Sequence, residues 1–457
     1  MIHPDSLRPA RAAGLVLVSL LALQPRVAAQ DSQYWSIQYG PVGQLVGGQV
    51  IGGVPDLSST FYNPGALALR NETSYLLSTE SVQWERVSTT AQPDLGLEIF
   101  DTSSSVFGAA PSLLAGALPH WLGENTHLAW SFLTRQKLDL RLGQRLTDPL
   151  PSPWDTSAAE NYFDERVTEN WGGLTLSRPL SDSVGLGMTL YGAYRGQRTR
   201  RELSAQGISG DGRSLAVSGV TDFDYAHYRT LAKLGLAWQE GEWTLGLSLT
   251  TPSLALFGSG DAAYTVSTSG TDANGDGRPD PPFLATETAE GLDADYRSSW
   301  AVGVGASKRI GHTRLYASAE WFAPVDRFTV IALPGTSAEA GRLTQELGSV
   351  MNGGLALEHA LSDEVSVYAA FHTDFSASVG GTNVAVSDWD LYHLGGGASF
   401  RLGGNRFTLG ALWATGGKDR PLRSPVPPED VPAAGLDRPV DIRYSKITFL
   451  LGFEFGK

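Results

Sequence analysis

Phe407-Thr-Leu-Gly-Ala-Leu-Trp413 decides the fold class, because successive side chains alternate in character along it. The apolar set is Phe407, Leu409, Ala411 and Trp413, and it alternates with Thr408, Gly410 and Leu412. The same period of two recurs at 365–372, 243–250 and 184–191. A period of two over this length is typical of a strand with two different faces. The sequence holds no helical pattern of comparable quality, so we expect an all-β protein.

The connections between the strands distinguish a soluble sandwich from a membrane barrel. Both folds give strands with one apolar face, but only an outer-membrane barrel alternates short turns with long loops. Six short connections lie near 119–125, 179–183, 239–242, 309–312, 360–364 and 402–405, and seven long ones at roughly 89–110, 146–165, 199–222, 258–292, 322–348, 375–388 and 416–440. They join fourteen strands and leave both termini on the short-turn side. We therefore predict a 14-stranded antiparallel transmembrane β-barrel over residues 71–457, which satisfies every backbone polar group in lipid.

Aromatic residues are expected at the two interfaces between such a barrel and water. Trp243 and Trp300 begin predicted strands, Trp321 and Trp413 end them, and Tyr444 precedes the last strand. The final alternating run resembles the terminal strand that the barrel-insertion machinery reads; it consists of Ile447, Phe449, Leu451, Phe453 and Phe455. It departs from the usual form in one respect, because Gly456 and Lys457 follow the last aromatic residue.

The N-terminus predicts export. Arg8 and Arg11 precede the apolar run 14–23, which is too short to span a bilayer as a helix, and small residues then lead to Val27-Ala-Ala29. We therefore expect residues 1–29 to be a cleaved signal peptide and the chain to reside in the outer membrane of a Gram-negative bacterium. With no cysteine in the chain, a lipoprotein anchor, a disulfide and thiol chemistry are all excluded.

Composition narrows the classes of partner. The formal net charge of −14 argues against a nucleic-acid partner. Charged residues make up 18% of the chain, which is below the ~25% that soluble domains usually carry. No linker that would separate two soluble domains is apparent in the sequence.

Residues 30–70 precede the first predicted strand and end in a specific motif. The stretch runs Asp56-Leu-Ser-Ser-Thr-Phe-Tyr-Asn63-Pro64-Gly65. It resembles the N-terminal hatch of the FadL/TodX family of outer-membrane transporters, with Asp56 at the acidic step and Gly65 where that family usually has Ala. Pro64 fixes its own φ and biases Asn63 toward extended backbone, and Asn63 can bond nearby backbone groups. Such a turn could seat a plug against the lumen wall; a solvated tail with a chance Asn-Pro turn is the alternative.

The resemblance implies a monomeric, passive transporter for hydrophobic compounds such as long-chain fatty acids. In that family the ligand is captured at outer loops, enters the lumen and leaves sideways through a gap in the wall into the membrane. The other partners implied are outer-membrane lipid and lipopolysaccharide. Two alternatives use the same sequence: a general diffusion porin, if residues 31–70 leave the lumen open, and a loop-based adhesin or structural barrel.

Charged residues on the predicted inward face are candidates for ligand contacts. Most charges inside a barrel pair with one another or with a plug. Arg135, Lys137 and Arg141 on the third strand are our candidates for binding a ligand carboxylate, since a buried acid needs a charge-assisted donor.

A predicted outer loop resembles the calcium loops of EF-hand and dockerin-like modules. Asp272, Asn274, Asp276 and Asp280 supply oxygen atoms at positions 1, 3, 5 and 9, with Gly277 at position 6. The twelfth position, which should carry a bidentate Glu, is Phe283, so Ca²⁺ would bind weakly. An acidic, glycine-rich loop without metal is the alternative, and no other cofactor is expected.

Enzyme signatures are absent from the sequence. It holds no G-x-S-x-G, no H-E-x-x-H and no phosphate-binding loop. A barrel hydrolase would need a Ser/His pair, for which His372 and His393 are the lumenal bases. We expect no enzymatic activity.

The calcium interpretation predicts an effect on proteolysis. Calcium should protect the 258–292 loop from protease, because ligation orders the chain around the ion. Limited proteolysis with calcium and with chelator measures this; equal cleavage rates would eliminate the cation site.

Overall fold

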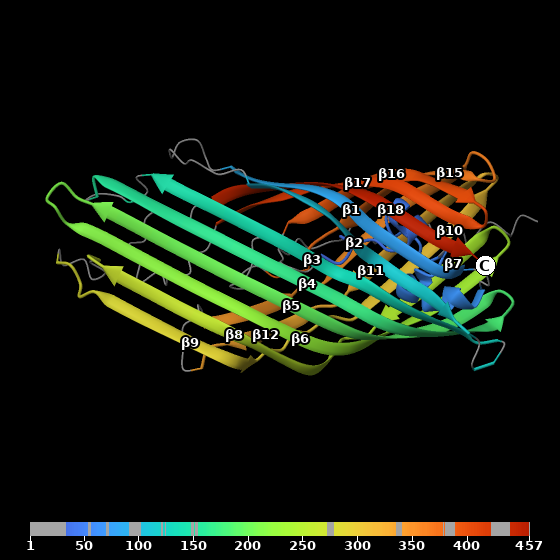
Figure 1. The fold of residues 1–457 in the computed structure, drawn as a ribbon, viewed down its shortest axis with the longest axis horizontal. Coiled ribbons are helices and arrows are strands. Elements are labelled where there is room, and N and C mark those ends of the chain that lie inside the picture. Colours follow the sequence, from blue (N-terminus) through green and yellow to red (C-terminus); the bar gives the residue numbers. More distant parts are fainter. Residues whose placement is uncertain are drawn as a thin grey trace, which may run out of the picture.

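The computed structural model describes residues 33–53, 56–69, 73–90, 102–119, 122–123, 125–147, 150, 154–271, 278–334, 341–377, 379, 389–421 and 439–456. They form a closed antiparallel β-barrel with strongly tilted strands (Figure 1). The strands are β1 (Thr73–Thr90), β2 (Thr102–Leu118), β3 (His127–Thr147), β4 (Thr156–Ser181), β5 (Val184–Ile208), β6 (Ser214–Glu240), β7 (Trp243–Thr250), β8 (Leu254–Ser269), β9 (Phe283–Asp293), β10 (Ala301–Ile310), β11 (Thr313–Phe322), β12 (Val325–Ala332), β13 (Arg342–Leu347), β14 (Val350–Ala360), β15 (Val365–Asp374), β16 (Asp390–Leu402), β17 (Asn405–Pro421) and β18 (Pro439–Gly456).

Fourteen strands form the wall of the barrel, as predicted. Sixteen of the strands form one sheet, which closes because β1 pairs with β18 and β5 pairs with β6. Two wall strands are each interrupted, so that β7 and β8 make one crossing and β9 and β10 make the next. The remaining pair, β12 and β13, forms a separate hairpin.

Five of the six predicted short connections are confirmed as turns, and they lie at the same end of the barrel as the C-terminus (Figure 1). The sixth, 119–125, is only partly among the described residues. The long connections differ from expectation. Residues 199–222 are mostly strand, because β5 continues to Ile208 and β6 begins at Ser214. The outward-facing residues Arg198 and Asp222 are charged, so these strands continue beyond the apolar belt. The pairing of β5 with β6 continues there because hydrogen bonds between strand backbones do not require surrounding lipid.

The outer surface carries the apolar belt expected of a membrane barrel. Leucines dominate its exposed side chains, as at Leu174, Leu190 and Leu247, and Trp243, Trp300, Trp321 and Trp413 are also exposed. Tyr444 contradicts the prediction, because it lies within β18, faces inward and stacks on Trp389 with ring centroids 5.2 Å apart. Within the described part of the chain, every helix is too short or too polar to cross a membrane.

The N-terminal segment 33–69 is folded inside the barrel. It contains α2 (Pro41–Leu45), α3 (Ser59–Tyr62) and the 3₁₀ helix η2 (Pro64–Leu69). Helix η2 contacts β4, β5 and β6, whereas α2 contacts β16, β17 and β18, so the segment touches widely separated parts of the wall. Its apolar residues form the largest buried cluster together with inward wall residues such as Leu133 and Tyr191. The protein's main core is therefore the contact between this segment and the barrel.

A second buried cluster fills the outer part of the barrel. The hairpin β12–β13 packs Phe328, Ile331 and Leu343 against inward residues of β4, β5, β6 and β8, including Leu203 and Val217. In consequence, the predicted long connection 322–348 is largely an ordered hairpin.

Candidate functional site

The Asn63-Pro64-Gly65 motif anchors the N-terminal segment to the wall. The buried Asn63 has extended backbone (φ −157°), as Pro64 predicts. Its amide nitrogen donates to the carbonyl oxygens of Ile51 (2.9 Å) and Leu236 (3.0 Å), and its amide oxygen accepts from the Gly65 N–H (3.1 Å). Asn63 therefore joins two parts of the segment to β6.

Glycines in the wall allow the Asn63-Pro64-Gly65 motif to pack directly against the strand backbone, and we call this contact the glycine seat. A Cβ at Gly65 would lie 2.5 Å from the carbonyl oxygens of both Gly185 and Gly235. A Cβ at Gly246 would overlap the Ile51 carbonyl oxygen and lie 2.6 Å from the Asn63 amide nitrogen. This close approach accounts for Gly at position 65, where the FadL/TodX pattern has Ala.

Asp56 is buried inside the same segment. One carboxylate oxygen accepts from the Ser58 N–H at 2.8 Å. The pKa of Asp56 is raised to about 6, mainly by burial and also by the nearby Glu454 charge, while the bonds from Ser58 oppose the shift. Asp56 therefore closes a local turn. Above that pH its carboxylate is negatively charged, and burial makes this charge costly because it is desolvated.

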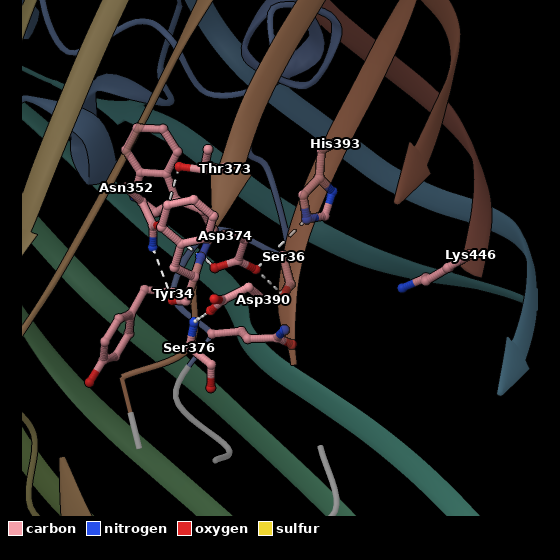
Figure 2. Close-up of polar contacts among 12 residues, drawn as sticks. Tyr34, Ser36, Asn352, Thr373, Asp374, Ser376, Asp390, His393 and Lys446 are labelled. Atoms are coloured by element: carbon pink, nitrogen blue, oxygen red, sulfur yellow. Dashed lines mark hydrogen bonds and ion pairs between the residues drawn. The ribbon is translucent and has the colours of Figure 1, made fainter. Parts of the chain in front are cut away.

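Asp374 on β15 anchors the start of the segment (Figure 2). Its carboxylate accepts from the Trp35 N–H at 2.8 Å and from the Ser36 hydroxyl at 2.5 Å. Glu320 on β11 accepts from the Trp35 indole N–H at 3.0 Å. Two buried carboxylates of the wall therefore bond to the segment, which keeps residues 35 and 36 in the lumen.

His372 and His393 stack beside this anchor, with ring centroids 4.3 Å apart and an interplanar angle of 9°. His393 Nε2 lies 3.9 Å from Asp374. None of the four ring nitrogens has a hydrogen-bond partner among the described residues, so no described serine is paired with either ring as a hydrolase would require.

A cavity lies between the N-terminal segment and the wall. Its volume is about 50 Å³, which is room for a few water molecules or a ligand head group, and its mouth is partly open. The lining residues come from many elements: Gln33, Tyr34, Phe61, Arg135, Gln136, Glu169, Trp171, Arg229, Leu231, Lys233, Thr250, Tyr296, Ser298, Ser299, Ala301, Glu320 and Phe322. Aromatic side chains form much of the cavity lining. The same lining contains the charged side chains Arg135, Glu169, Arg229, Lys233 and Glu320.

Ion pairs satisfy only part of the charge in this cavity. Glu169 accepts from Arg195 at 3.2 Å and also from Arg229, and Lys233 lies 3.3 Å from Glu320. All five side chains are buried. Two further guanidinium nitrogens of Arg229, Nε and Nη1, have no hydrogen-bond partner among the described residues.

Arg135 differs from the other cations, because the described structure gives it no carboxylate partner in an ion pair. Its Nη1 donates to the Tyr34 carbonyl oxygen at 2.7 Å. Its guanidinium lies 5.6 Å from the ring centroids of Tyr34 and Trp171 and 5.8 Å from that of Phe61. Aromatic rings thus hold this cation at the cavity.

A β-bulge corrects the prediction for the third strand. In the pairing of β3 with β4, Thr134 faces Asn170 and Gln136 faces Glu169, so Arg135 is an extra residue. A bulge places two successive side chains on one face and reverses the alternation beyond it. Lys137 and Arg141 are therefore exposed, and Arg141 pairs on the outer surface with Asp139 (3.7 Å) and Asp164 (3.4 Å). Of the three candidates, only Arg135 lines the cavity.

The wall is incompletely paired between β2 and β3. The two strands are paired only from Leu113 to Leu118 on β2, although β2 continues to pair with β1 as far as Thr102. Beyond this point the Thr134 hydroxyl donates to the Pro111 carbonyl oxygen at 3.1 Å. Ile37 of the N-terminal segment and Lys137 line a small pocket at this divergence.

The calcium-like loop lies mostly outside the described residues. Asp272, Asn274 and Asp276 are among the residues not described, and Asp280 donates its backbone N–H to the Thr271 carbonyl oxygen at 2.6 Å. Where the structure is described, no cluster of three or more His, Asp or Glu side chains could hold a metal ion. The calcium site remains a prediction.

Comparison with known proteins rests on structure. Neither a protein-family model nor a curated protein sequence matches the chain. A Pseudomonas aeruginosa FadL homologue superposes with a TM-score of 0.61 at 13% identity, over 93% of this chain and 99% of that one. The Pseudomonas putida toluene transporter TodX gives 0.57 at 10% identity (93% and 99%), and the Ralstonia pickettii toluene transporter TbuX gives 0.52 at 12% (92% and 98%). The fold predicted from the resemblance is confirmed, and with the apolar belt it indicates an outer-membrane protein.

The close packing at Gly246 predicts that adding one methyl group at this position weakens closure of the lumen. Gly246→Ala should displace Ile51 and Asn63, because overpacking costs about 1–3 kcal/mol. We expect faster swelling of proteoliposomes in a small sugar, with a barrel that still folds.

Gly172→Ala is the matched control, since a Cβ there meets nothing within 4 Å. Equal swelling rates for Gly246→Ala, Gly172→Ala and the parent chain would contradict this role of the seat.

Proposed function

We propose that this barrel, which has the fold of the FadL and TodX channels, admits hydrophobic molecules that carry an acidic head group. The observation that carries the proposal is Arg135, a half-buried cation held by aromatic rings at a cavity. The long-chain fatty acids suggested by the sequence resemblance are one class of such molecules.

The charge of the cavity favours an anion. Its lining, together with Arg195, holds four cationic side chains and the two carboxylates Glu169 and Glu320. A surplus of buried positive charge is costly unless a counter-charge arrives. A ligand carboxylate would supply that charge and accept hydrogen bonds from Nε and Nη1 of Arg229, which have no partner among the described residues.

The rest of the lining suits an apolar tail. Phe61, Trp171, Leu231 and Phe322 present rings and methyl groups to the same space. Burying such a tail contributes roughly 25 cal/mol per Å² of apolar area. The head group would then fix the orientation, and the tail would supply most of the affinity.

We propose the divergence of β2 from β3 as the sideways exit. The N-terminal segment already contacts this place, because the Tyr39 hydroxyl donates to the Thr134 carbonyl oxygen at 3.0 Å. Movement of the segment would therefore open a path from the lumen to lipid. In a general diffusion porin, by contrast, the lumen would be open before any ligand arrives.

The structural neighbours also include channels named for toluene, a neutral compound. An uncharged ligand would make no use of Arg135. Comparing an acid with its methyl ester of equal chain length therefore separates the two ligand classes.

Arg135→Gln should weaken binding of a long-chain acid by about 10- to 100-fold, because hydrogen bonds to charged groups contribute about 1.5–3 kcal/mol. Binding of the methyl ester should change little. Titration of the purified protein with a fluorescent acid and its ester measures both.

Arg141→Gln, on the same strand but exposed, is the matched control and should leave both affinities unchanged. If Arg135→Gln lowers the affinity for acid and ester equally, the acidic head is not what Arg135 recognises. Tight binding of the ester alone would assign the cavity to neutral ligands.

A further inference from the structure

The wall has a second break, far along the chain from β2 and β3. Pairing of β8 with β9 ends at Ser259 and Asp293, and pairing of β7 with β10 begins at Thr250 and Ala301. Between them, 251–258 and 294–300 face each other without a β-ladder. Pro252 lies in the first stretch and has no N–H to donate.

The break leaves the first stretch paired on its other side but takes the second out of the sheet. Leu254 and Phe257 remain paired with Thr230 and Tyr228 of β6. Segment 294–300 leaves the sheet instead, and the Asp295 N–H donates to the Val330 carbonyl oxygen of the inner hairpin at 2.9 Å. This unpaired line between 251–258 and 294–300, which we call the seam, therefore lies between the seventh and eighth wall strands.

Two serines hold the middle of the seam. The Ser253 N–H donates to the Ser298 hydroxyl at 3.1 Å, and the Ser298 N–H donates to the Ser253 hydroxyl at 3.3 Å. At its outer end the Ala294 N–H donates to the Gly258 carbonyl oxygen at 3.4 Å. Such bonds are fewer and weaker than a continuous ladder.

The inner side of the seam is the wall of the cavity. Tyr296, Ser298 and Ser299 all line it. The Tyr296 ring lies 4.0 Å from the guanidinium carbon of Arg195 and 4.7 Å from that of Arg229. A displacement of segment 294–300 would therefore open the cavity itself.

The outer side of the seam faces lipid. Leu254, Leu256 and Phe257 are 69%, 61% and 64% exposed, and Trp300 on the other edge is 47% exposed. Phe257 stacks on Tyr228 at 4.5 Å, as expected of an aromatic girdle at the interface. Unpaired backbone at membrane depth is tolerated where it lines a cavity, which is its position here.

From this arrangement we infer that the seam is a second lateral portal, through which apolar ligands pass between the cavity and the outer leaflet. The inference rests on the proposed function, which supplies the ligand. It assigns the Ser253–Ser298 contact as the closure of the portal and places it apart from the divergence of β2 and β3.

The chain has no cysteine, so a disulfide can close the seam cleanly. In the double variant Ser253→Cys, Ser298→Cys, oxidation should slow the exchange of a fluorescent long-chain acid between the protein and surrounding vesicles by about tenfold, equivalent to a barrier higher by about 1.4 kcal/mol. The equilibrium affinity should stay unchanged, and reduction should restore the rate.

Thr265→Cys, Thr286→Cys is the matched control, placed in β8 and β9 of the same two wall strands. Its hydroxyls lie 3.0 Å apart within the intact ladder, so oxidation there should leave exchange unaltered. Unchanged exchange in the oxidised seam variant, with normal binding, would overturn the portal and leave the proposed function standing. Failure of the seam cysteines to oxidise in a folded, heat-modifiable barrel would overturn it too, whereas absence of binding in the parent chain would remove the proposed function first.

Discussion

Backbone hydrogen bonding in lipid is the constraint on which this structure depends. A strand edge exposed to hydrocarbon costs several kcal/mol for each unpaired group, so a sheet in the membrane must close. Here closure joins β1 to β18 and β5 to β6. Among the described residues, the ladder lapses beside Thr134 and beside Ser253, and both places lie next to pockets and carry hydroxyl bonds instead. Breaks in the ladder therefore coincide with the places where a ligand could cross the wall.

Closure leaves a lumen, and the N-terminal segment lies in the half of it near the short turns (Figure 1). Glycine seats at Gly185, Gly235 and Gly246 let its backbone approach the wall, and the carboxylates Asp374 and Glu320 bond to its start. The space that remains is bounded by cations in excess of carboxylates. Packing and charge thus leave a small, partly open cavity among the described residues that suits the head group of an amphipathic molecule.

The alternating pattern and the turn signals in the sequence were sufficient for the strand number and the turns, because both depend on local pattern. The position of the N-terminal segment was expected from the resemblance of its Asp56–Gly65 motif to a transporter hatch, and periodicity did not predict it. The cavity depends on register between strands, which single-strand periodicity does not encode. Glu169, Arg229 and Lys233 were missed for that reason. The bulge at Arg135 reversed the faces of Lys137 and Arg141, and only its pairing with β4 reveals it. Pro252 interrupts one edge of the seam, but the opposing stretch 294–300 carries no proline, so the sequence does not mark the seam as a pair.

The central claim is that the N-terminal segment closes the lumen, and single-channel conductance in a planar bilayer tests it most directly. The refolded, heat-modifiable full-length protein should be nearly silent, whereas a variant lacking residues 31–70 should show large, stable openings. Large, stable openings from the full-length protein would contradict the account and indicate a general diffusion porin.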